Sequence, residues 1–169
     1  MTTLDTPSAD SLPADVLNAF TRLTGAQRMP PLYRQIGNSS AALGAYLGAE
    51  QALKDGVLSP RDIETIKLLI SGRNRCAFCI KTHRAKAEAA GMASQDINAA
   101  LAGSALSDPR LDAIRGACEQ LLAGDELGHA QRSALEANGV DQAGLVEIAL
   151  AMAVISFTNW FNHINHTPA

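Results

Sequence analysis

Two cysteines, a histidine and a glutamate are the residues of this chain whose types and spacing could carry chemistry. Cys76 and Cys79 are three residues apart, and His83 follows four residues after the second cysteine. If this segment is helical, both thiols and the imidazole fall on one face, because positions i, i+3 and i+7 nearly eclipse. A nucleophile, a resolving thiol and a base at this spacing indicate a redox or a metal site.

The redox interpretation depends on making a thiolate, because the thiolate and not the thiol is the nucleophile. Near the start of a helix, unsatisfied N–H groups and the positive end of the dipole would stabilise a thiolate on Cys76 or Cys79. Arg73 and Arg75 add positive charge nearby. His83 could take or relay a proton, and a sulfenic acid on one cysteine could condense with the other.

Glu64 is the fourth candidate, on the helix expected before the cysteines. It lies twelve residues before Cys76, and its neighbours Ile63, Ile66 and Ile70 indicate a buried strip. A glutamate alone is more often a solvated helix residue. A carboxylate that faces the imidazole would fix its tautomer and hold a proton relay in place.

A zinc site is the competing interpretation of the same residues. Cys76, Cys79 and His83 offer three ligands, and His163 or His166 could supply a fourth. Structural zinc sites usually take ligand pairs from separate loops and not three ligands from one helix. The spacing therefore favours redox chemistry over zinc, and His163 and His166 are otherwise expected to be structural residues at a helix end.

Composition and charge limit the class of protein. The chain has 169 residues, 47% of them hydrophobic and 4% aromatic, a balance that favours helices. A net charge of −3 gives no reason to expect nucleic acid as a partner. Three cysteines, of which Cys118 lies on an apolar helix face, do not indicate a secreted disulfide framework. We therefore expect a cytoplasmic protein.

The N-terminus has no signal-peptide pattern, and no segment is expected to enter a membrane. The most apolar stretch, from Leu145 to Phe161, contains Glu147, Ser156 and Asn159 and is short for a bilayer span. It is interpreted as a helix buried on most sides, in the core or at a subunit interface.

The pattern of caps and apolar positions predicts an all-α fold of about eight or nine helices, without alternating strand patterns. Residues 1–10 are expected to be a flexible tail, and residues 11–169 one helical domain. Ser59-Pro60-Arg61-Asp62 is the strongest helix start. Helices are expected over about 11–23, 41–55, 59–72, 75–91, 94–101, 129–139 and 141–162. Two more are expected with one end defined: a short helix that ends at residue 36, and a helix that starts at residue 108.

Over about residues 41–163 the sequence resembles the carboxymuconolactone decarboxylase superfamily, and within it the alkylhydroperoxidase D-like branch. The family pattern is a glutamate in one helix and Cys-x-x-Cys-x-x-x-His opening the next. Glu64, Cys76, Cys79 and His83 match it. The end of the last predicted helix, with its asparagines in 155–162, also resembles the family.

The resemblance implies a helical fold that forms trimers or hexamers and acts as a thiol-dependent peroxidase without a metal, flavin or haem. In that reading Cys79 attacks the hydroperoxide, Cys76 resolves it to a disulfide, and His83 and Glu64 with a water relay protons. An external dithiol, in some members a lipoyl group on a partner protein, would reduce the disulfide. Some family peroxidases have a second histidine immediately before the second cysteine. This chain has Phe78 at that position.

Two other functions remain open at this point. One is a lyase like the superfamily's lactone decarboxylases, although that chemistry needs acid and base groups and no dithiol. The other is a non-enzymatic helical oligomer whose thiol pair senses redox state or binds a metal.

Overall fold

Two helices, α4 and α9, connect the parts of this all-helical molecule. The computed structural model describes residues 3–168, which form nine α-helices, a short 3-10 helix at Ala9–Ser11 and no β-strand, so the all-α prediction is confirmed. The α-helices are α1 (Ala14–Thr24), α2 (Pro31–Ile36), α3 (Ser40–Asp55), α4 (Pro60–Arg73), α5 (Ala77–Ala89), α6 (Ser94–Ala102), α7 (Pro109–Ala123), α8 (His129–Ala137) and α9 (Gln142–Ile164).

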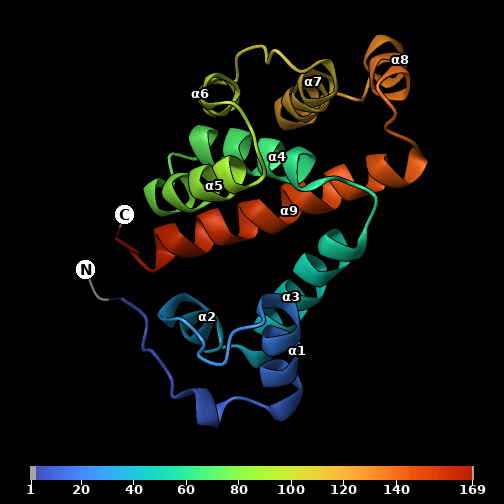
Figure 1. The fold of residues 1–169 in the computed structure, drawn as a ribbon. Helices are drawn as coiled ribbons and strands as arrows, with labels where there is room; N and C mark the ends of the chain where they lie inside the picture. The colour runs from blue at the N-terminus through green and yellow to red at the C-terminus, as the bar shows by residue number, and fades with distance from the viewer. Residues whose placement is uncertain (1–2, 169) are drawn as a thin grey trace.

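Helix α9 runs through the middle of the molecule, with α4 and α5 on one side and α1, α2 and α3 on the other (Figure 1). Helix α4 packs against α5, α6, α7 and α9, and α3 packs against α1, α2 and α9. The two ends of the chain lie on the same side of the molecule (Figure 1), where the Leu4 N–H donates to Asn165 Oδ1 at 2.8 Å.

The start of α4 is fixed by its own sequence and by α7. Ser59 Oγ accepts from the Asp62 N–H at 3.2 Å and Asp62 Oδ2 accepts from the Ser59 N–H at 2.9 Å, a capping box with Pro60 at the first helical position. Asp62 is fully buried and also binds the Arg110 guanidinium of α7. The predicted helix start therefore also anchors α4 to α7.

Helix α4 is buried on nearly all sides. Ile66, Leu68, Leu69 and Ile70 are each at most 2% exposed, and burying one such side chain contributes roughly 1.5–3 kcal/mol. Four of the five buried polar residues of α4 have a partner on another helix: Asp62 with Arg110 on α7, Glu64 with His83 on α5, Lys67 with Glu50 on α3, and Ser71 with Asn159 on α9. The fifth, Thr65, donates to the Arg61 carbonyl of its own helix.

The turn between α4 and α5 differs from the expectation that Gly72 ends the helix. Helix α4 continues to Arg73, and the chain reverses at Arg75, whose φ of 54° lies in the left-handed region. The Cys76 N–H then donates to Ser71 O at 3.1 Å. Gly72 has another role, since a Cβ there would collide with the carbonyl oxygen of Leu101 on α6.

As a consequence, the helix with the cysteines starts later than predicted. Cys76 is the N-cap of α5 and not a residue of its first turn, and α5 ends at Ala89, before Gly91. Cys79 is the third residue of the helix, so its N–H is one of the donors that the helix itself leaves free.

Helix α9 is exposed on one face, which the sequence did not indicate. Its other face packs against α3, α4, α5 and α7, whereas Val146, Trp160 and Ile164 are more than half exposed. One face of the helix is thus buried in the core, and its burial at a subunit interface stays a prediction. Within the described residues α9 is also the one helix that could span a bilayer by length and composition alone.

Residues 3–8 have no helical structure but are held in place by hydrogen bonds. Besides the bond of Leu4, Asn38 Nδ2 donates to Asp5 O at 2.8 Å and the Arg34 guanidinium donates to Pro7 O at 3.2 Å. The sequence favoured a flexible tail over 1–10, of which residues 1 and 2 lie outside the described part. The described residues of this segment contact α2 and the end of α9. No local sequence pattern could reveal these contacts.

Candidate active site

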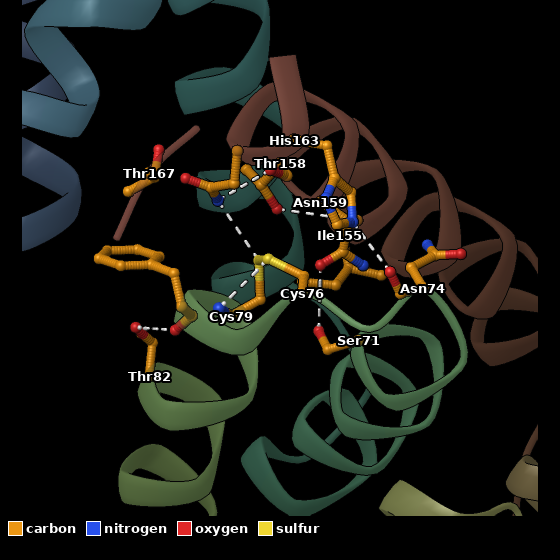
Figure 2. The surroundings of a disulfide bond; sticks show 12 residues. Ser71, Asn74, Cys76, Cys79, Thr82, Ile155, Thr158, Asn159, His163 and Thr167 are labelled. Atoms are coloured by element: carbon orange, nitrogen blue, oxygen red, sulfur yellow. Dashed lines mark hydrogen bonds between the residues drawn. A yellow bond between two sulfur atoms is a disulfide. The ribbon is translucent and has the colours of Figure 1, made fainter. Parts of the chain in front are cut away.

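The two cysteines lie at the start of α5 and face α9. They form a disulfide with their Cα atoms 5.2 Å apart, and Figure 2 shows it close to Thr158, Asn159 and His163. Each cysteine is 3% exposed. Cys76 Sγ accepts a hydrogen bond from the Cys79 N–H at 3.3 Å. The predicted one-face arrangement of the two sulfurs is thus present, with the positive end of α5 directed at Cys76.

Asn162 of α9 is the side chain that contacts Cys79. Its Nδ2 donates to Cys79 Sγ at 3.3 Å and to Thr158 O at 2.8 Å. Asn162 is 5% exposed, and its Oδ1 is buried without a hydrogen-bond donor among the described residues. A neutral N–H donor at this place stabilises negative charge on the sulfur. Sequence reasoning missed this contact, because 83 residues separate the partners.

Glu64 and His83 form the pair that their spacing predicts. His83 Nδ1 and Glu64 Oε2 are 2.7 Å apart, and both side chains are buried. A carboxylate can only accept, so Nδ1 carries the proton and Nε2 has a free lone pair. Burial lowers the pKa of His83 below its usual value, and Glu64 opposes this shift. His83 is therefore held as a neutral base.

A buried ion pair lies beside the hydrogen-bonded pair of Glu64 and His83. Lys67, one turn after Glu64 on α4, is 2% exposed, and its Nζ is 2.8 Å from both carboxylate oxygens of Glu50 on α3. Tyr46 donates to Glu50 Oε1 at 3.2 Å. Burial raises the pKa of Glu50, but the charge and hydrogen bond of Lys67, together with the charge of Lys86, outweigh burial, so the net shift of the pKa is downward. Lys67 also adds to the lowering of the His83 pKa.

Two cavities reach this group of residues from different sides. One, of about 460 Å³, lies between α3, α4 and the end of α1, and Glu50, Glu64 and Lys67 line it. Its remaining wall is mostly apolar and includes Leu23, Tyr33, Leu53 and Ile63.

The other cavity, of about 250 Å³, lies at the start of α5 and the end of α9. Cys76, Phe78, Asn162 and His163 are among its lining residues, and Cys79 is not. One cavity is therefore lined by Glu64 of the proposed relay, and the other by one of the two disulfide cysteines.

The four predicted site residues occur as two contacting pairs on α4 and α5. Cys76 is bonded to Cys79, and Glu64 is hydrogen-bonded to His83. Cys79 and His83 are four residues apart on α5, so they lie on neighbouring turns of one face. The sequence missed Asn162, Glu50 and Lys67, although an asparagine in an otherwise apolar helix and a lysine in an isoleucine-rich helix were detectable signals.

The other cysteine and the two late histidines are placed as follows. Cys118 is fully buried in the core between α4, α7 and α9, and burial raises its pKa to about 12, which makes it a poor nucleophile. His163 Nε2 donates to Asn74 O at 2.8 Å, and it lines the cavity at Cys76 together with His166. Both histidines thus lie near their own chain's disulfide.

Within residues 3–168 no three His, Cys, Asp or Glu side chains are grouped so that they could hold a metal ion. Cys76 and Cys79 share a disulfide, and His83 Nδ1 contacts Glu64. His163 uses Nε2 for the carbonyl of Asn74. The set of residues considered for zinc is therefore divided between other partners.

Comparisons with known proteins identify a matching family model. Residues 39–119, which contain the four predicted site residues, match the model of the carboxymuconolactone decarboxylase family. No protein among those with curated functions matches the sequence.

Solved structures share the fold at low sequence identity. An uncharacterised peroxidase-related protein from Ralstonia eutropha JMP134, described as an alkylhydroperoxidase AhpD core, has a TM-score of 0.81 and 20% identity over 99% of this chain and 91% of its own. An uncharacterised peroxidase-related protein from Silicibacter sp. TM1040 has a TM-score of 0.76 and 22% identity over 98% and 90%. The debrominase Bmp8 has a TM-score of 0.71 and 14% identity over 96% and 89%.

Proposed function

Because residues 39–119 match the carboxymuconolactone decarboxylase family and the chain has the fold of the alkylhydroperoxidase AhpD core, we propose that it is a member of that family that acts as a thiol-dependent peroxidase. Its substrate class is an organic hydroperoxide, and its reducing equivalents come from the Cys76–Cys79 dithiol. The observation that supports this most is the disulfide between two cysteines on α5, one turn from a buried neutral histidine that a carboxylate holds in place.

The first step makes and uses a thiolate on Cys79. Nε2 of His83 takes the thiol proton, and Nδ2 of Asn162, 3.3 Å from the sulfur, stabilises the charge. The thiolate attacks the distal oxygen of the hydroperoxide, and the O–O bond breaks. The alkoxide leaves and receives a proton from His83, so the products are a sulfenic acid and an alcohol.

The second step closes the disulfide. The Cys76 thiol loses its proton to the relay, and its sulfur attacks the sulfenic sulfur of Cys79. The S–O bond breaks, and hydroxide leaves as water with the relayed proton. The cysteines need little movement, because the start of α5 holds them with Cα atoms 5.2 Å apart.

Glu64 acts through His83. Its carboxylate accepts from Nδ1 and so leaves Nε2 as the unprotonated nitrogen, which can take the proton of Cys79, four residues earlier on α5. When His83 is briefly protonated, the neighbouring carboxylate compensates the buried charge. Glu64 is therefore a positioning residue, with a bridging water as an additional member of the relay.

The rest of the cycle needs other molecules. An external dithiol, free or as a lipoyl group on a partner protein, reduces the disulfide, and no metal, flavin or haem takes part. The protein would work as a homo-oligomer, a trimer or hexamer, in the cytoplasm, where reductants are supplied continuously.

The test is the reaction of the reduced protein with cumene hydroperoxide in a stopped-flow instrument. Cys79→Ser should abolish hydroperoxide consumption, and activity near the parent value would contradict the role of Cys79. Cys76→Ser should give one fast sulfenylation without a disulfide. Normal cycling of this variant with a dithiol would mean that another residue resolves the sulfenic acid.

The lyase alternative is tested in the same preparation. A reaction that needs only Glu64 and His83 as base and acid would persist in Cys79→Ser, whereas peroxide reduction would not. Because Bmp8 has this fold and is a debrominase, bromide release from a bromopyrrole is the useful comparison reaction. Faster turnover of that substrate than of any hydroperoxide would replace the proposed function.

A further inference from the structure

The cavity at the start of α5 is lined by one of the two cysteines. Its volume is about 250 Å³, and its lining includes Cys76 but not Cys79. Both α5 and the last turn of α9 contribute walls, through Phe78, Asn162 and His163. A molecule in this cavity would therefore lie against Cys76 and not against Cys79.

The one fully charged side chain that lines this cavity is positive. It is Arg75, and no Asp or Glu lines the cavity, whose polar lining also includes the imidazoles of His163 and His166. Arg75 is exposed, and no ion pair joins it to another described residue. The N-terminus of α5, a helix of 13 residues, adds the positive end of its dipole.

The end of α9 does not cancel this charge. Its last carbonyl oxygens already accept hydrogen bonds, those of Phe161, Asn162 and His163 from the N–H groups of Asn165, Thr167 and His166. The negative end of the α9 dipole is therefore largely satisfied by its own chain. The remaining field in the cavity favours an anion.

Asn162 supplies a second, independent feature of a binding site. It lines the cavity and is 5% exposed, and its Oδ1 has no donor among the described residues. A buried acceptor without a donor costs free energy, which a bound S–H, N–H or O–H group would recover. The same side chain donates through Nδ2 to Cys79 Sγ at 3.3 Å.

From these observations we infer that this cavity is the reductant site, and that the reductant is a small thiol with a negatively charged group close to its sulfur. The inference rests on the disulfide cycle of the proposed function and adds where the reductant enters, which sulfur it attacks and which charge it carries. Arg75 would bind the acid group, and the thiol would approach Cys76.

The reduction balances as two thiol–disulfide exchanges. The reductant thiolate attacks Cys76 Sγ, the Cys76–Cys79 bond breaks, and the electron pair goes to Cys79, whose thiolate Asn162 stabilises. A second thiol then attacks the reductant sulfur of the mixed disulfide and releases Cys76 as a thiolate, next to the Cys79 N–H at 3.3 Å. Two thiols are oxidised to one disulfide, and the protons that they lose restore both cysteine thiols.

Three thiols of similar size test the charge preference: 2-mercaptoethanesulfonate, 2-mercaptoethanol and cysteamine. The disulfide is prepared with diamide, so the experiment does not depend on peroxide chemistry. Each rate is divided by the rate of the same thiol with a small neutral disulfide. We expect the sulfonate to exceed cysteamine roughly three- to tenfold at low salt, with the ratio falling as salt increases. Equal normalised rates would overturn the inference.

Variants assign the preference to the cavity. Arg75→Asn removes the charge with a residue that tolerates a left-handed φ, and should remove most of the preference, while Arg75→Lys should keep it. Lys81→Glu changes an exposed charge on the same helix outside the cavity and should leave it intact. A preference that survives in Arg75→Asn would contradict the assignment. Circular dichroism melting shows that each variant is folded.

Mass mapping identifies the attacked sulfur and the source of the acid group. A rapid acid quench with 2-mercaptoethanesulfonate should trap the mixed disulfide on Cys76, and adducts mainly on Cys79 would refute the attack route. Dihydrolipoate and dihydrolipoamide differ only in the carboxylate. Faster reduction by dihydrolipoate would support a free anionic thiol as the reductant. Dihydrolipoamide resembles a protein-bound lipoyl group, and faster reduction by this compound would overturn the inference.

Discussion

Cys76 and Cys79 are covalently joined but have different surroundings. Cys76 receives a backbone N–H at the start of α5 and lines a cavity, whereas Cys79 receives the amide of Asn162 and shares a helix face with His83. In the proposed cycle this difference separates the roles: Cys79 reacts with the hydroperoxide, and Cys76 meets the thiols that regenerate the dithiol.

Replacing Asn162 by alanine tests the role of its amide. The variant loses the donor to Cys79 Sγ, and a hydrogen bond to a charged group of this kind contributes about 1–2 kcal/mol. We expect oxidation of the reduced protein by cumene hydroperoxide to slow roughly five- to thirtyfold. Stopped-flow kinetics measure it, with Ser156→Ala on the same helix as the control. An unchanged rate would show that the amide does not stabilise the thiolate.

Glu64→Gln tests the relay through its pH dependence. In the wild-type protein the carboxylate of Glu64 raises the pKa of His83 against the effect of burial. Glutamine still accepts from Nδ1 but has no charge. The His83 pKa should therefore fall further. In the pH profile of the oxidation rate, the acid limb should move to lower pH. The less basic Nε2 should lower the maximal rate about tenfold.

The control for this profile is Glu88→Gln, an exposed change on α5. A movement of the acid limb to higher pH in Glu64→Gln, or no movement at all, would remove Glu64 from the relay.

At the scale of helices, the site depends on how α4 ends and α5 begins. Proline, serine and glycine patterns predicted most elements, for example the start of α4 at Ser59-Pro60 and the end of α1 at Gly25, whose φ is 68°. These signals are local, because caps act within one turn.

Local signals failed where tertiary contacts decide. Gly72 suggested a helix end, yet the glycine is required for the close approach of α6, and Arg75 makes the turn with a φ of 54°. The four motif residues could be found from their spacing. Asn162 and the Glu50–Lys67 pair could not be assigned to the site, because their partners lie on other helices.

Gly72→Ala tests the close contact of α4 with α6. The added methyl group would meet Leu101 O, a backbone atom that cannot turn aside. We expect the free energy of unfolding to fall by about 1–3 kcal/mol, as for overpacked cores. Urea denaturation of the oxidised protein measures the change.

Gly48→Ala is the matched control on α3. No atom lies within 4 Å of a Cβ placed there, so alanine should stabilise the helix by about 0.5–1 kcal/mol. Equal effects at the two glycines would contradict the close packing of α4 on α6.

At the scale of the whole molecule, α4 is the hub and α9 has an uncovered apolar side. Trp160, the single tryptophan, is 62% exposed, and Val146 and Ile164 are 71% and 66% exposed. An apolar cavity of about 290 Å³ lies between α3 and α9, lined by Ala153 and Phe157 among others. This surface fits the proposed homo-oligomer, because exposed apolar patches mark interfaces.

Ala153→Glu tests that interface. A carboxylate in the apolar cavity should dissociate the oligomer, which light scattering after gel filtration detects, and should shift the emission of Trp160 to longer wavelength. Ala85→Glu makes the same change at an exposed position of α5 and should not alter the assembly. A wild-type protein that is monomeric at micromolar concentration would contradict the oligomer.

The central claim is that the two cysteines of α5 form a redox-cycling pair driven by hydroperoxide. The most direct measurement is the intact mass of the fully reduced protein before and after one equivalent of cumene hydroperoxide, with thiols mapped by alkylation. The account predicts the loss of two hydrogens, located at Cys76 and Cys79 and reversed by a dithiol. Unreactive thiols, or oxidation located at Cys118, would contradict it.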